Sequence, residues 1–135
     1  MSEQETPSVS VEPLLGYPAL LVTWQYQIVP EEMAAAFQTI REIFDSVDRK
    51  MFVVMDLTNN PQLEVLEVVT HATPVFKHPR SAKWLFVGQS GLGRVVESKL
   101  ISLTRRDSAV IWFDTLDEAF DYLQVLDSTS SYRSE

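Results

Sequence analysis

The chain has 135 residues, 45% of them hydrophobic, which is enough for one compact core and too short for two ordinary domains of roughly 100 residues or more each. A formal net charge of −8 argues against nucleic acid as a partner, because binding to a phosphate backbone depends on Lys and Arg. The absence of cysteine excludes disulfides, thiolate metal ligands and cysteine nucleophiles.

The polar, acidic residues 1–7 cannot serve as a secretory signal, and no apolar run approaches the roughly 18 residues that a transmembrane segment needs. We therefore expect a soluble cytoplasmic protein. Its folded domain should span residues 8–126, between disordered tails at residues 1–7 and 127–135.

Residues 9–14 and 19–26 are predicted to form two strands of a hairpin, because Gly16 and Pro18 mark a turn between them. Pro30 then begins a helix with apolar residues spaced to form one buried stripe, namely Met33, Phe37, Ile40, Phe44 and Val47. The apolar run of residues 51–57 is typical of a central strand that is covered on both faces.

Asn60 and Pro61 resemble an N-cap followed by a first-turn proline, and they predict a helix through Leu66 that Pro74 must end. Residues 73–82 contain two prolines and no regular period. We expect them to form the longest irregular connection, a candidate mobile flap.

Residues 83–88 predict a strand, residues 91–105 a helix, and residues 110–113 the last strand. The helix should bury Leu92, Val95, Val96, Leu100 and Leu103. Thr115 and Glu118 have the spacing of a capping box before a final helix that ends near Leu126. The order of elements predicts an α/β fold with a mixed, mostly parallel five-stranded sheet and about four helices.

The Asp56-Leu57-Thr58 element after the central strand and the closing segment of residues 112–123 resemble the SpoIIAA-like proteins of the STAS superfamily. The resemblance covers residues 9–126 and implies a STAS-like fold. STAS anti-sigma-factor antagonists also carry an Asp-Ser-Ser-Gly element whose serine is phosphorylated. Residues 64–67 stand at that place here and contain no hydroxyl, so the resemblance implies a regulatory module without the usual phosphoserine switch. It also implies kinship in fold with CRAL-TRIO lipid carriers.

In open α/β sheets, ligands bind beyond the carboxyl ends of the strands. The candidate ligand-binding residues are the polar and glycine residues that follow the third and fourth strands, namely Asp56, Thr58, Asn59, Asn60, Gln89, Ser90, Gly91 and Arg94. Asp114 and Thr115 follow the last strand at the same edge. The segment of residues 88–94 predicts either a cradle for a small anion or a simple helix cap.

The sequence contains no recognisable catalytic constellation. His71 and His78 lie on either side of Pro74 without a third metal ligand, so we expect no metal site. Thr58 and Ser90 are either phosphoacceptors or caps. Glu64 and Glu67 are better explained as solvated helix-start carboxylates than as a catalytic pair. We expect no cofactor and no enzymatic activity.

Residues 77–106 contain seven of the eleven Lys and Arg residues and one acidic residue, Glu97. This basic segment could contact an anionic membrane, a partner, the acidic surface of a second copy of the chain in a homodimer, or only solvent. The sequence therefore leaves two functional hypotheses. The first is a non-enzymatic regulatory module that acts through protein contacts, and the second is a carrier or sensor of a lipid-like or small anionic ligand with peripheral membrane association.

Overall fold

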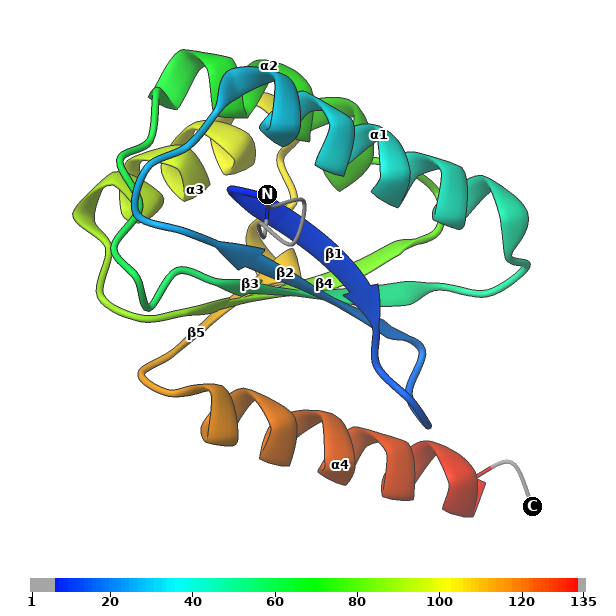
Figure 1. The fold of residues 1–135 in the computed structure, drawn as a ribbon. Helices are drawn as coiled ribbons and strands as arrows, with labels where there is room; N and C mark the ends of the chain where they lie inside the picture. The colour runs from blue at the N-terminus through cyan, green and yellow to red at the C-terminus, as the bar shows by residue number, and fades with distance from the viewer. Residues whose placement is uncertain (1–6, 134–135) are drawn as a thin grey trace, which may run out of the picture.

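A five-stranded sheet lies between two unequal layers of helices (Figure 1). The computed structural model describes residues 7–133, and the side chains of residues 7–126. The first two strands pair antiparallel and all later neighbours pair parallel, which confirms the predicted mixed, mostly parallel sheet. In order across the sheet, the strands are β1 (Val9–Pro13), β2 (Ala19–Trp24), β3 (Met51–Asp56), β4 (Ser81–Val87) and β5 (Val110–Phe113).

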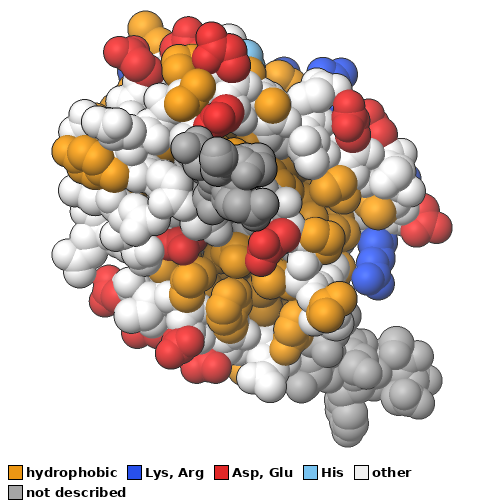
Figure 2. Space-filling view, in the orientation of Figure 1, with side chains coloured by type: hydrophobic (Ala, Val, Ile, Leu, Met, Phe, Trp, Pro, Cys, Tyr) orange, Lys and Arg blue, Asp and Glu red, His pale blue; other side chains and the backbone are white. Residues whose placement is uncertain are grey.

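Three helices cover one face of the sheet and a single helix covers the other (Figure 1). The three are α1 (Pro30–Ser46), α2 (Val65–Phe76) and α3 (Gly91–Thr104), and the single helix is α4 (Leu116–Arg133). A short 3-10 turn, η1 (Asp107–Ala109), joins α3 to β5. Because one helix cannot cover five strands, apolar side chains reach the surface along the seam between the sheet and α4, as Figure 2 shows.

The central strand is β3, as its nearly continuous apolar run predicts. Val53 and Met55 belong to the core beneath the three helices, whereas Val54 belongs to the smaller core under α4. Alternate side chains of one strand are thus buried on opposite faces, which is why the run shows no polar alternation. The predicted stripe on α1 is also buried from Met33 to Phe44, whereas Val47, its last predicted member, is the half-buried C-cap of the helix.

Helix α2 differs from its prediction at both ends. Asn60 has a positive φ of 54° and lies in a turn, and the helix starts only at Val65, because Gln62 is bonded to Tyr26 and holds the intervening chain outside the helix. Pro74 does not end the helix but lies within its last turn. Because Pro74 has no N–H, the carbonyl of Thr70 loses its helical hydrogen bond. Thr70 is an exposed residue, so water can replace the missing donor.

The predicted flap is therefore wrong, since its first residues are helical and β4 begins at Ser81. On α3, Leu92, Val95 and Leu103 were expected inside but are exposed, while Val96 and Leu100 are buried.

Helix α4 continues to Arg133, beyond Leu126, where we expected the ordered chain to end. Within the described residues, no helix combines the length and apolar character needed to cross a bilayer.

Candidate functional site

The carboxyl ends of β2, β3, β4 and β5 lie along one edge of the sheet, which we call the carboxyl edge. The pairing of Asp56 with Val87 places the loop after β3 next to the loop after β4. All eight residues predicted from the sequence to bind a ligand belong to the end of β3, to these two loops or to the first turn of α3 that follows.

Asp56 and Asn59 brace the loop after β3. The carboxylate of Asp56, which is 7% exposed, accepts hydrogen bonds from the backbone N–H of Thr58 at 3.0 Å and from its hydroxyl at 2.6 Å. Asn59 donates from Nδ2 to the carbonyl of Trp24 at 2.9 Å. These polar groups already have partners within the protein, and they hold the end of β3 against the end of β2.

The loop after β4 is shaped by close packing. Gly88 has a φ of 116°, and a Cβ atom there would lie 3.1 Å from the carbonyl of Leu57. Ser90 is 1% exposed, and its Oγ accepts from the N–H of Gly93 at 2.9 Å, which confirms its interpretation as an N-cap. The amide of Gly93, which an anion cradle would use, is thus occupied by a side chain of the loop itself.

Arg94 extends from the first turn of α3 over an aromatic ring. Its guanidinium carbon lies 4.1 Å from the centroid of Trp112, which donates in turn from Nε1 to Glu97 at 2.9 Å. This stacking fixes the orientation of the cation at the carboxyl edge.

An open groove of about 550 Å³ lies at the carboxyl edge, on the side of the three helices. We call it the carboxyl-edge groove, and it is lined by Gln27, Ile28, Val29, Gln62, Leu63, Glu64 and Leu92. None of the eight residues predicted from the sequence lines it. The sequence signal for these lining residues is weak, since most of them belong to two irregular loops and show no period.

Hydrogen bonds tie the two loops of the groove together. The N–H of Gln62 donates to the carbonyl of Tyr26 at 2.8 Å, and its Nε2 donates to the Tyr26 hydroxyl at 2.9 Å. On the opposite side, Ser8 accepts from the N–H of Val29 at 2.9 Å and donates its own N–H to Glu32 at 2.6 Å. The backbone bond from Ser8 lowers the pKa of Glu32. The walls of the groove are therefore held in place by local bonds.

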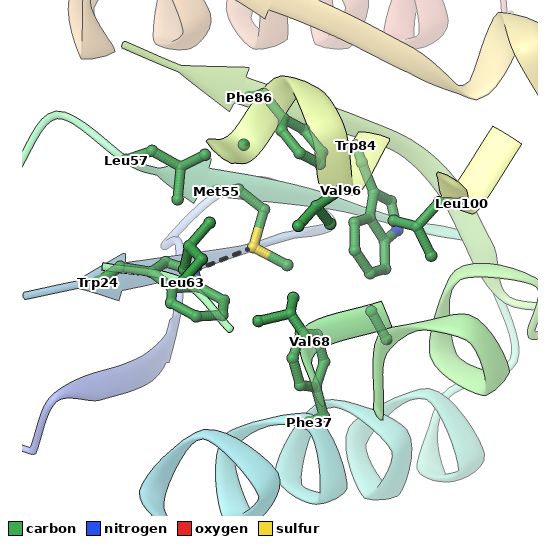
Figure 3. Close-up of a pocket in the computed structure, with 12 residues that line it drawn as sticks. Trp24, Phe37, Met55, Leu57, Leu63, Val68, Trp84, Phe86, Val96 and Leu100 are labelled. Atoms are coloured by element: carbon green, nitrogen blue, oxygen red, sulfur yellow. Dashed lines mark hydrogen bonds between the residues drawn. The ribbon is translucent and has the colours of Figure 1, made fainter. Parts of the chain in front are cut away.

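A small cavity of about 20 Å³ lies in the core beneath the groove (Figure 3). Its lining is entirely apolar apart from the indole nitrogens, and the indole N–H of Trp24 donates to the sulfur of Met55 at 3.4 Å. Leu63 lines both the cavity and the groove, so it stands between them. The space matches roughly one small group, since a single water needs about 10–15 Å³ by the same measure.

The remaining polar candidates have structural partners. Thr115 accepts from the N–H of Glu118 at 3.2 Å, and Glu118 accepts from the N–H of Asp114 at 3.0 Å, which confirms a capping arrangement at the start of α4. The ring of His78 lies 2.8 Å from a carboxylate oxygen of Asp45. Across residues 7–126, no three His, Asp or Glu side chains gather as metal ligands would.

The groove can bind by packing and hydrogen bonding. Its side chains are apolar or amide, with one carboxylate, Glu64.

No protein-family model matches this chain, and no curated protein is significantly similar to it.

Proposed function

We propose that this protein is a non-enzymatic binding module that recognises an apolar segment of a partner protein in the carboxyl-edge groove. The observation that carries the proposal is the gathering of exposed apolar side chains there. Val29 and Leu92 line the groove and are each 43% exposed, and Val95 follows Leu92 one turn along α3. Exposed apolar patches on soluble proteins commonly mark interaction sites.

The walls of the groove are suited to binding without prior rearrangement. The Tyr26–Gln62 bonds join the two loops, and the Ser8–Val29 bond fixes the start of α1. A preorganised site spends less of its binding free energy on ordering its own loops. This rigidity supports recognition of a defined partner segment.

The charges around the groove favour a partner with basic residues. Glu64 lines it, and Glu31 and Glu67 occupy the first turns of α1 and α2, against one cation, Arg94, in the first turn of α3. A segment that combines apolar side chains with Lys or Arg would complement both features. Complementary charge would mainly increase the rate of association and the discrimination between partners.

The resemblance to STAS regulators supports the same proposal. The Asp56-Leu57-Thr58 element forms a braced turn, and residues 64–67 carry no hydroxyl that could act as the usual phosphoserine switch. We therefore propose regulation through protein contacts alone. Robust turnover that is lost on changing one polar residue of the carboxyl edge would contradict the non-enzymatic assignment.

Site-specific photo-crosslinking tests this proposal. A photoreactive amino acid at position 92 is expected to give a discrete adduct with one partner in the cells that make the protein. The control is position 124 on α4, where Gln124 is also exposed but lies in the other helix layer. The adduct should disappear in a V29D variant. Equal labelling from both positions, or none from position 92, would refute the proposal, and an adduct with a second copy would identify a homodimer.

The apolar cavity beneath Leu63 favours a second candidate function, the binding of an amphipathic ligand. Its present volume admits only a small group, so an acyl chain would require Leu63 and its neighbours to move. Native mass spectrometry of freshly purified protein should then show a copurified mass, which an L63W variant would lose. For the membrane-associated form, sedimentation with anionic liposomes at low salt should detect binding.

A further inference from the structure

A second open pocket, of about 500 Å³, lies at the edge of the sheet where β3 and β4 begin. We call it the amino-edge pocket. Four of its eight lining residues are cationic, and none is acidic: Lys50, Phe52, Ala82, Lys83, Arg105, Arg106, Ser108 and Ala109. It shares no residue with the carboxyl-edge groove.

The tertiary structure assembles these cations from distant parts of the chain. Lys50 immediately precedes β3, Lys83 lies on the neighbouring β4, and Arg105 is the C-cap of α3. The pairing of Met51 with Ser81 brings the starts of the two strands together. Lys50 lies outside the basic segment of residues 77–106, so the sequence alone did not associate it with this cluster.

Arg105 has an unusual backbone conformation. Its φ is 61°, in the left-handed region that glycine normally occupies at a helix C-cap, and its N–H donates to the carbonyl of Ile101 at 2.7 Å. A large side chain there is unfavourable by comparison with glycine. Arg105 adopts this unfavourable backbone conformation, and its guanidinium lines the pocket.

The charge of Arg106 is held by neutral groups. Its guanidinium donates to the carbonyl of Phe76, to the hydroxyl and carbonyl of Ser81 at 3.3 and 3.2 Å, and to the carbonyl of Ala82 at 3.3 Å. Burial lowers the pKa of Arg106, because desolvation disfavours the charged form. Arg106 therefore anchors this edge through neutral groups, and none of the carboxylates of residues 7–126 compensates its positive charge.

Relative to the side chains of residues 7–126, the other three cations have donors that no protein group occupies. Lys83 donates one hydrogen bond, to the carbonyl of Ser108 at 3.3 Å. Among the side chains that the structure describes, neither Lys50 nor the guanidinium of Arg105 has a hydrogen-bond partner, and no carboxylate lies within 4.0 Å of any of the four cations.

We propose that the amino-edge pocket binds a ligand that carries two phosphoryl groups. Four positive charges, with no carboxylate among the residues that line the pocket, match the charge of such a ligand, because each phosphoryl group contributes about −1.5 to −2. Arg105 can contact phosphate oxygens with two N–H groups, while Lys50 and Lys83 act as point charges. The volume is in the range of small-molecule sites, roughly 300–1,000 Å³. The ligand is either a soluble phosphorylated molecule or a phosphoinositide headgroup.

Titration of the full chain with inorganic pyrophosphate, followed by calorimetry at low salt, tests the pocket. K83Q and R105N should each weaken binding by about ten-fold or more, as loss of a charge-assisted hydrogen bond predicts. Asparagine is chosen at position 105 because it tolerates a positive φ. The matched control is K99Q, which removes the same charge from the exposed Lys99 on α3 outside the pocket.

The outcomes separate the pocket from general charge attraction. Weaker binding in K83Q and R105N, with K99Q unchanged and all variants folded by circular dichroism, supports the proposal. An equal effect of K99Q would show nonspecific attraction and overturn it. Failure of pyrophosphate to bind, together with failure to bind vesicles that contain phosphatidylinositol bisphosphate, would also overturn it.

A vesicle experiment distinguishes the two sources of the phosphoryl groups. If the ligand is a headgroup, the protein should sediment with vesicles that contain phosphatidylinositol bisphosphate, pyrophosphate should release it, and R105N should sediment less. If the ligand is soluble, pyrophosphate should bind while those vesicles do not retain the protein. Because the two pockets share no residue, neither result depends on the partner proposed for the carboxyl-edge groove.

Discussion

Replacement of Gly88 by alanine should strongly destabilise the fold. Gly88 directly follows β4 and has a φ of 116°, a conformation that residues with a side chain rarely adopt. A Cβ atom would lie 3.1 Å from the carbonyl carbon and oxygen of Leu57 and 3.2 Å from the nitrogen of Thr58. These are backbone atoms of the adjacent loop, so no rotamer change can relieve the contact.

The size of the effect follows from these two contributions. An unfavourable backbone conformation costs about 1–3 kcal/mol, and forcing an additional carbon into a packed site costs roughly 1–3 kcal/mol. The lower entropy of the unfolded chain with alanine offsets about 0.4–1 kcal/mol. We therefore expect the free energy of unfolding to fall by about 1–5 kcal/mol, a large part of the roughly 5–15 kcal/mol typical of a domain.

Urea unfolding followed by tryptophan fluorescence measures this change. With a slope of about 2 kcal/mol per molar, the middle of the range for small proteins, the midpoint of G88A should fall by about 0.5–2.5 M while the slope stays unchanged. G91A is the matched control, because Gly91 is exposed and a Cβ atom added there would have no atom within 4 Å apart from its chain neighbours and the nearby backbone of its own helix. It should change the free energy of unfolding by less than about 1 kcal/mol, since only the helix preference differs.

A loss of less than about 1 kcal/mol in G88A, or an equal loss in G91A, would show that the loops after β3 and β4 do not pack as described. The description of the carboxyl edge as a rigid, tightly packed structure would then be wrong.

Three further changes test other contacts. S90A removes the acceptor for the N–H of Gly93 and should lower the free energy of unfolding by about 1 kcal/mol, measured by urea unfolding; no loss would mean that the cap contributes nothing. R106M retains bulk but leaves several carbonyls without their charged donor, so it should lower the free energy of unfolding by about 2 kcal/mol or more. R106K should restore little of this stability, because a single ammonium group cannot reach all of these carbonyls. The pKa of Glu32 is lowered from its ordinary value of 4.5, so its bond to Ser8 stabilises the folded state fully at pH values above 4.5. This stabilisation is lost as the pH falls through the lower pKa of the folded state. Thermal unfolding at about pH 6 should therefore show E32Q less stable than the native chain, and the difference should shrink as the pH falls below about 4; a constant difference would contradict the assignment.

Local patterns predicted most of the elements. The alternation and spacing of apolar residues identified every strand and the buried stripe of α1, because these signals depend on neighbouring residues alone. Thr115 was identified as a cap for the same reason, and a cap was one of the two interpretations of Ser90. Errors arose where distant contacts decide the outcome, as with Pro61, where the bond between Gln62 and Tyr26 delays the start of α2.

The sequence by itself determined that residues 51–57 are buried on both faces and therefore form the middle of an α/β sheet, since a nearly continuous apolar run is stable as a strand only when both of its faces are covered. Only the tertiary structure decided which side chains line the two pockets. Leu63 and Leu92 meet at one edge, and Lys50 and Arg105 at the other, because strand pairing and helix packing join segments that no local pattern relates.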